Sequence, residues 1–363
     1  MVQFFLTDIH FQDESPAVSA RSLEDFEAEE YCDHVREIEE QEKRPRELVA
    51  ILFGRTEKDG DVCAMVKGFR PEMYYDYLAD IEGGAHRTLS EIRSQIGAAA
   101  LENFRKQALV AISTTIGARG TLIGEWKDRC DAGDLELDDA GIRKPHVYLC
   151  VTFPSLFAYN RARYWEPADA ETADPRLRPH HTRPVVESKF CCVAGIWPSQ
   201  WVRIDDFMPN KTHKASHCSI ELTCTIDKLH HVDREDHAPL VISAFDIECI
   251  SAKEEFPNAD EDGDKVVSVA ISSWYLNQPL SEPTRRWAVI VNGCAPIDDA
   301  QCVWAADEHE LHLLVRDQFI RLGTDVIASW NGNGFDWVYM HDRASELATR
   351  NWQGFFYLSK LKF

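Results

Sequence analysis

The stretch Ala244-Phe245-Asp246-Ile247-Glu248-Cys249 alternates apolar and acidic side chains along a strand-like run. Residues two apart in a β-strand share a face, so Asp246 and Glu248 should point to one side while Phe245 and Ile247 pack on the other. Two adjacent carboxylates on a central strand repel each other and lose solvation. A divalent cation would compensate, because Mg²⁺ prefers carboxylate oxygens. An edge strand with one solvated face explains the alternation equally well, and the pattern alone leaves both interpretations open.

The residues around this stretch predict an α/β domain with a mixed sheet. Asp307 can cap a helix, with Glu310 three residues later as in a capping box, and Gly323 can end that helix. The predicted elements are three strands, a helix, a strand and a second helix, at 240–249, 265–275, 286–291, 307–322, 326–329 and 335–349.

A second acidic feature lies in Ser329-Trp330-Asn331-Gly332-Asn333-Gly334-Phe335-Asp336. Here a buried strand ends, a glycine-rich turn follows, and Asp336 stands in the first turn of the next helix. Taken alone, Asp336 is explained as a complement to the helix dipole, and the glycines as an ordinary turn. An acid at the carboxyl end of a strand, in the same domain as the strand-borne pair, favours a shared site instead.

The first half of the chain has a different residue pattern, which predicts a strand-rich unit. The acidic segment 24–47, interrupted by Pro45, predicts a solvated helix and linker. The pair Asp59-Gly60 separates two apolar runs, which predicts a β-hairpin. The predicted elements are hairpin strands at 48–54 and 62–66, a helix at 89–113, a strand at 146–153 and a surface loop at 164–184.

Composition restricts the class of protein. A net charge of −22 argues against binding nucleic acid through Lys and Arg alone. Residues 1–50 hold 14 acids and 5 bases, so −9 of that charge is local, and a protein that binds DNA through metal ions and aromatic contacts need not be basic overall. The 11 irregularly spaced cysteines indicate reduced thiols in the cytosol or nucleus. No apolar run reaches the ~18 residues of a membrane span, and the start does not resemble a secretory signal.

The acidic features also carry a specific resemblance. Phe245-Asp246-Ile247-Glu248-Cys249, followed by Phe256-Pro257 and Asp264, resembles the first exonuclease motif of family B DNA polymerases, and of the delta type most of all. The second motif is similar at Asn331, Phe335, Asp336, Tyr339 and Arg343-Ala344. Further similarity reaches the start of the chain, at Phe4-Phe5, Asp8-Ile9, 53–56, 66–71, Trp201 and 238–240.

This resemblance implies a ribonuclease H-like 3′→5′ exonuclease domain at 236–363, preceded by a β-rich α+β amino-terminal domain at 1–235. It implies that Asp246, Glu248 and Asp336 are catalytic and hold two Mg²⁺ or Mn²⁺ ions. Asn331 and Phe335 would then position the frayed single-stranded 3′ end of DNA. The implied partners are DNA, accessory polymerase subunits and a sliding clamp, with no membrane. The implied location is the nucleus, or the host cell for a large DNA virus.

The sequence departs from the family pattern in ways that bear on activity. Trp330 stands where Tyr is frequent, Gly332 and Gly334 replace bulkier or polar residues, and Val338 replaces a frequent Pro, changes expected to loosen the turn. The third exonuclease motif has no counterpart in the 27 residues after Asp336, and the polymerase motifs are absent. We therefore expect this chain alone to be a weak or inactive nuclease, although a longer parent polymerase would be active. The alternative is an inactive nucleic-acid-binding or scaffold fragment. The retention of Asp246, Glu248 and Asp336 argues against this alternative.

Overall fold

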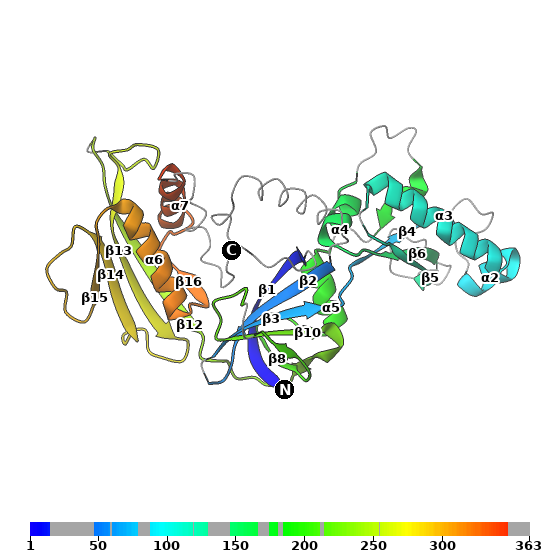
Figure 1. Ribbon diagram of the computed structural model, residues 1–363, viewed down its shortest axis with the longest axis horizontal. Coiled ribbons are helices and arrows are strands. Elements are labelled where there is room, and N and C mark those ends of the chain that lie inside the picture. Colours follow the sequence, from blue (N-terminus) through cyan, green and yellow to red (C-terminus); the bar gives the residue numbers. More distant parts are fainter. Residues whose placement is uncertain are drawn as a thin grey trace, which may run out of the picture.

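The computed structural model describes residues 1–14, 47–58, 60–78, 88–118, 120–129, 146–165, 174–180, 184–210, 214–253 and 255–347. The acidic segment predicted at 24–47 lies outside these residues, except for Glu47. The described residues form three β-sheets. Figure 1 shows the sheets in a row along the long axis, with the first sheet between the other two.

The first sheet has seven strands in the order β11-β8-β1-β2-β3-β10-β9. The predicted hairpin is confirmed as β2 and β3, in which Arg55 pairs with Asp61 and the Thr56 amide donates to the Gly60 carbonyl at 2.7 Å. Asp59, the other turn residue, lies outside the described part. The bounds are β1 Val2–Glu14, β2 Glu47–Arg55, β3 Asp61–Lys67, β8 Gln200–Ile204, β9 Met208–Pro209, β10 Ile220–Thr225 and β11 Leu229–Val232.

Burial on both faces explains why β2 reads as a continuous apolar run. Leu48, Ala50 and Leu52 face the main core of the first two sheets, whereas Val49 and Ile51 face a smaller cluster on the other side. A strand covered on both faces needs apolar residues at every position, so its sequence shows no alternation.

The second sheet has the order β5-β6-β4-β7. The single helix predicted at 89–113 is instead two helices, because Gly97 adopts φ 85° and interrupts the helical backbone between them. The loop predicted at 164–184 contains a short 3₁₀ turn and a two-residue strand in its described part. The bounds are β4 Glu72–Tyr75, α2 Leu89–Ile96, α3 Ala98–Ile116, β5 Ile123–Arg129, β6 His146–Thr152, α4 Leu156–Arg163, η2 Pro175–Leu177, β7 Pro179–His180 and α5 Val186–Ala194.

The third sheet has the order β15-β14-β13-β12-β16 and is mixed, as predicted. β12 and β14 are antiparallel to β13, whereas β16 runs parallel to β12 and β15 parallel to β14. The strand β15 was not predicted, because its five residues lie at the sheet edge with Gln301 and Trp304 exposed. The bounds are β12 Val241–Ile250, β13 Lys265–Tyr275, β14 Arg285–Val291, β15 Gln301–Ala305 and β16 Val326–Ala328.

Two predicted helices complete this part of the chain, α6 Glu308–Leu322 and α7 Asp336–Glu346. Figure 1 shows α6 lying across the sheet with α7 near one end. The Asp307 side chain accepts the Glu310 amide at 2.8 Å, as predicted. The Glu310 carboxylate accepts the Ala306 amide, one residue before the cap, so only half of the capping box forms. Gly323 ends α6 in the left-handed conformation.

A buried ion pair joins the first sheet to the third. Nε of Arg55, the last residue of β2, lies 2.5 Å from Oδ2 of Asp325, and the two side chains are 5% and 0% exposed. Arg55 also donates to the Gly323 carbonyl, and Asp325 accepts the Val241 amide at 2.9 Å. Within the described ranges, no helix combines the length and the apolar character that crossing a bilayer requires.

Candidate active site

The two strand-borne acids lie on the open face of β12. Asp246 and Glu248 are exposed, whereas Phe245 and Ile247 are buried in the core of the third sheet. The alternation predicted from the sequence is therefore present in the structure. The core face is closed by the helices, because the Phe245 ring contacts Phe319 of α6 and Trp337 of α7, with centroids 6.0 Å and 5.2 Å apart.

Neighbouring strands explain why both interpretations of the alternation were reasonable. β12 is internal at its start, where it pairs with β13 and with β16 as far as Ala244. Asp246 and Glu248 lie beyond the end of β16 and pair only with Ala270 and Ser268 of β13. The acids therefore lie on an internal strand of the sheet, in the part of that strand that β16 no longer covers.

The turn after β16 is tightly closed. Asn331 adopts φ 59°, in the left-handed region, and its carbonyl accepts the amides of Gly334 and Phe335 at 2.8 Å and 2.9 Å. The Trp337 amide donates to the Gly332 carbonyl at 2.9 Å. The expectation that the glycines loosen this turn is therefore wrong for the structure described here.

Asp336 is the first residue of α7 and is only 4% exposed. Its Oδ2 accepts a hydrogen bond from the Ser329 hydroxyl at 3.0 Å. Sequence reasoning did not give Ser329 a role, although it opens the motif; a hydroxyl seven residues before the acid was the available signal. This bond explains how a nearly buried carboxylate is accommodated at the helix start.

Cys249 lies near acids from several elements. Burial, together with the negative charges of Glu308, Glu248 and Asp336, raises the pKa of its thiol to about 12. The Cys249 side chain is therefore a neutral thiol at physiological pH. It therefore adds no further negative charge near these acids.

Among the described residues, no group of three or more His, Cys, Asp or Glu side chains is arranged to hold a metal ion. The oxygen donors of Asp246 and Glu248 suit a hard divalent cation, and both side chains are accessible on one face. Asp336 accepts the Ser329 hydroxyl through Oδ2, which leaves its other oxygen as a possible ligand. The donor chemistry of these residues therefore fits a divalent metal ion.

Aromatic side chains lie beside the turn. The Phe335 ring contacts Tyr339 and Phe256, with centroids 5.2 Å and 5.0 Å apart. Phe256 belongs to the loop between β12 and β13 and is 77% exposed, while Trp330 in the turn is 92% exposed. A cavity of 470 Å³ is lined by the turn itself, Asn331 included, together with Phe245 and Trp337.

A buried ion pair anchors the loop that carries Phe256. Nη2 of Arg343 lies 2.6 Å from Oε2 of Glu308, with the side chains 3% and 4% exposed, and this hydrogen bond raises the pKa of Arg343. Nη1 of Arg343 also donates to the Ala259 carbonyl at 2.8 Å, while Glu308 accepts the Val266 amide at 2.8 Å. No local sequence signal indicates a role for Glu308, because its burial depends on tertiary packing.

Asp264 closes the same loop from within. Its carboxylate accepts the amides of Ala252 and Asn258 at 2.8 Å and 2.9 Å. These backbone hydrogen bonds lower the pKa of Asp264, the Asn258 amide having the larger effect. Asp264 therefore stabilises the loop backbone as a carboxylate and does not point toward the acids of β12.

Comparison with known proteins matches residues 186–362 to the model of the exonuclease domain of DNA polymerase family B. The DNA polymerase delta catalytic subunit of Drosophila melanogaster is 24% identical over 326 residues, covering 86% of this chain and 28% of that protein. The DNA polymerase of Acanthamoeba polyphaga mimivirus is 23% identical over 345 residues, covering 87% and 18%. The DNA polymerase catalytic subunit of Saimiriine herpesvirus 2 (strain 11) is 28% identical over 152 residues, covering 40% and 14%.

The fold agrees with this family. The structure of the family B DNA polymerase from Pyrobaculum calidifontis superposes with a TM-score of 0.57 at 16% identity, covering 95% of this chain and 32% of that one. The chain thus spans about a third or less of the length of these relatives. The mixed third sheet with α6 and α7 has the ribonuclease H-like fold of the family's exonuclease domain. The chain therefore contains the exonuclease region of a family B DNA polymerase, matched at residues 186–362, and its similarity to DNA polymerases extends over most of its length.

Proposed function

We propose that this chain provides the 3′→5′ proofreading exonuclease of a family B replicative DNA polymerase, which removes 3′-terminal nucleotides from DNA. The observation that carries the proposal is the pair Asp246 and Glu248 on the accessible face of β12, inside a domain matched to the family's exonuclease. Asp336 follows the parallel neighbour β16 and completes the proposed catalytic set.

In this proposal Asp246 and Glu248 hold a divalent cation, Mg²⁺ or Mn²⁺, and Asp336 contributes to a second ion. When bound, the ions supply an activated water and offset the charge that develops on the leaving 3′ oxygen. The hydrogen bond from Ser329 engages only Oδ2 of Asp336, so its other oxygen can serve as a ligand. We expect the chain alone to be weakly active or inactive because the third exonuclease motif, which would supply a further carboxylate, has no counterpart in it.

Asn331 and Phe335 have positioning roles in the proposal. Phe335 lies beside the exposed Phe256 ring, and stacking of a base on an aromatic side chain contributes ~1–3 kcal/mol. The left-handed backbone conformation of Asn331 sets the direction in which its side-chain amide projects from the turn. A mismatched 3′ end frays more readily than a paired one, so a site for single strands selects mismatches.

The test is Mn²⁺ binding followed by thermal unfolding, because a cation that binds only the folded chain raises Tm. We expect saturating Mn²⁺ to raise Tm and Asp246→Ala to abolish most of that rise. Glu282→Ala, which removes an exposed acid of the same domain away from β12, is the matched control and should keep it. Loss of the Tm rise in both variants would show unspecific binding and contradict the metal site.

The alternative function is an inactive nucleic-acid-binding or scaffold module that kept the fold. The retention of Asp246, Glu248 and Asp336 speaks against it. Under this alternative Mn²⁺ leaves Tm unchanged. Release of nucleotides from 3′-labelled single-stranded DNA measures activity directly, and robust Mg²⁺-dependent release that Asp246→Ala removes would contradict both the alternative and the expectation of weak activity.

By analogy with the relatives, we propose that the substrate is the single-stranded 3′ end of DNA. Accessory polymerase subunits and a sliding clamp are the proposed partners of the polymerase. The relatives are delta catalytic subunits and viral DNA polymerases, which supports a location in the nucleus, or in the host cell for a viral protein.

A further inference from the structure

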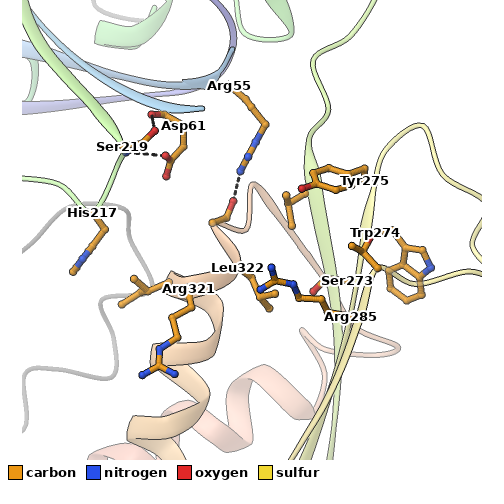
Figure 2. Close-up of a pocket in the computed structure, with 14 residues that line it drawn as sticks. Arg55, Asp61, His217, Ser219, Ser273, Trp274, Tyr275, Arg285, Arg321 and Leu322 are labelled. Carbon is orange, nitrogen blue, oxygen red and sulfur yellow. Dashed lines mark hydrogen bonds between the residues drawn. The ribbon is translucent and has the colours of Figure 1, made fainter. Parts of the chain in front are cut away.

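A cavity of 350 Å³ lies where the first sheet meets the third, and Figure 2 shows its lining side chains. The first unit contributes the ends of β2 and β3 and residues 217–219, while the third contributes the ends of β13, β14 and α6. β12 borders the cavity at Val241, its first residue, and carries Asp246 and Glu248 further along. The cavity is therefore separate from the proposed exonuclease site.

The cavity concentrates positive charge in a strongly acidic chain. Three arginines and one aspartate line it, although the chain as a whole carries −22. Arg55 is neutralised by the buried Asp325. Arg285 and Arg321 are exposed, and neither forms an ion pair with another described residue. In Figure 2 the guanidinium of Arg285 is turned toward Leu322, across the gap between β14 and the end of α6.

The single acid in the lining, Asp61, is engaged by a backbone amide. Oδ1 of Asp61 accepts the Ser219 amide at 2.8 Å, and the Asp61 carbonyl accepts the Ser219 hydroxyl at 3.0 Å. Asp61 therefore serves to hold residue 219 against β3. Arg285 is the guanidinium placed to receive an anion, since Figure 2 shows the Arg321 side chain turned away from it.

The shape and chemistry favour a nucleotide over a bare anion. Guanidinium groups bind phosphate oxygens through paired hydrogen bonds. Tyr275 lines the same cavity on the face of β13 that carries Ser273, the residue paired with Arg285, and aromatic side chains are surfaces on which bases stack. A volume of 350 Å³ exceeds what a phosphate alone fills and falls in the range of small-molecule sites. We propose that this cavity binds the phosphate and base of a nucleotide, either as a free nucleoside monophosphate or as one unit of a nucleic-acid strand, with Arg285 as the main phosphate ligand.

The matched control is present in the sequence. Arg286 follows Arg285 on β14, so its side chain points to the opposite face; it lies 3.9 Å from Asp299 and does not line the cavity. Arg285→Ala and Arg286→Ala remove the same charge from adjacent positions. Any difference between them therefore reports the cavity and not the overall charge of the chain.

The experiment is isothermal titration of the full chain with dAMP, with a short oligo(dT) and with inorganic phosphate, in EDTA so that no metal-dependent cleavage occurs. We expect dAMP or oligo(dT) to bind, Arg285→Ala to weaken that binding at least ~10-fold, since each 1.4 kcal/mol is tenfold, and Arg286→Ala to change it less than twofold. Tighter binding of dAMP identifies a free nucleotide as the ligand, and tighter binding of oligo(dT) identifies a strand.

Three results would overturn the proposal: no binding of either nucleotide ligand, equal weakening by the two arginine variants, or phosphate binding as tight as that of dAMP. Asp246→Ala should leave the titration unchanged. This variant tests whether the ligand binds at the cavity or at the exonuclease site. The cavity proposal can therefore fail while the exonuclease proposal stands, and the reverse.

Discussion

At the scale of single residues, the turn between β16 and α7 shows how glycine can place a functional side chain. A Cβ on Gly332 would lie 2.7 Å from the Cβ of Ser329, the residue that bonds Asp336. A Cβ on Gly334 would lie 2.3 Å from Oδ1 of Asn331. The two glycines that depart from the family pattern are thus the residues that let Ser329 and Asn331 keep their positions.

His312 gives a prediction at the same scale. It is 0% exposed in α6, and burial lowers its pKa to about 3, with the charge of Arg343 contributing. The folded chain holds a neutral imidazole, whereas the unfolded chain takes up a proton below ~6.5. His312 therefore does not lower the free energy of unfolding above pH ~6.5. As the pH falls from ~6.5 toward 3, protonation of the unfolded chain lowers this free energy by up to ~1.4 kcal/mol per pH unit.

Urea unfolding of His312→Leu between pH 7 and pH 4.5 checks this prediction. In this variant the free energy of unfolding should fall less steeply as the pH is lowered, because the contribution of His312 is gone. His10→Leu, at an exposed histidine, should retain the wild-type slope. A slope that is unchanged in His312→Leu would mean that carboxylates alone cause the acid sensitivity.

At the scale of elements, local sequence signals predicted most of the third sheet. The alternating run of β12, the cap at Asp307 and the stop at Gly323 all act within a few residues, and the structure confirms them. β15 was missed because its pairing with β14 is not local and its side chains are half exposed. The three acids could be named from motifs, but the bond from Ser329 to Asp336 could not, since it depends on how the turn folds.

The ion pair of Arg343 and Glu308 links α6, α7 and the loop between β12 and β13, and it carries the next prediction. Arg343→Ala leaves Glu308 buried without its partner, which costs ~3–5 kcal/mol of unfolding free energy. Arg316→Ala breaks the exposed pair with Asp317, at 2.9 Å, and should cost ~1 kcal/mol or less. Chemical denaturation measures both values, and similar losses in the two variants would refute the role of burial.

Hydrogen exchange adds a local readout to the Arg343 variant. The amides of Ala252 and Asn258 are bonded to Asp264 within the loop that Arg343 holds at Ala259. We expect these amides to exchange faster in Arg343→Ala than in Arg316→Ala. The loop positions Phe256 beside Phe335, so its mobility bears directly on the proposed binding of a 3′ end.

At the scale of the whole molecule, the chain has two main cores. The first two sheets share one, to which Leu6 of β1 and Val151 of β6 both belong, whereas the third sheet packs with α6 and α7 around a core of its own. Separate cores imply that the third sheet can unfold apart from the rest unless the junction couples them. Figure 1 agrees, with the third sheet set beside the first rather than stacked on it.

The ion pair of Arg55 and Asp325 is the buried charge pair of that junction, and its removal should uncouple the two parts. Arg55→Ala leaves Asp325 at 0% exposure without its cation, a change that costs ~3–5 kcal/mol. Because the loss falls on the contact between the cores, we expect calorimetry to resolve two unfolding transitions in this variant where the parent chain shows one. Arg203→Ala, which breaks an exposed pair with Asp205, should keep a single transition. A single transition in Arg55→Ala would place the coupling in the apolar contacts of Trp201 and Leu240 instead.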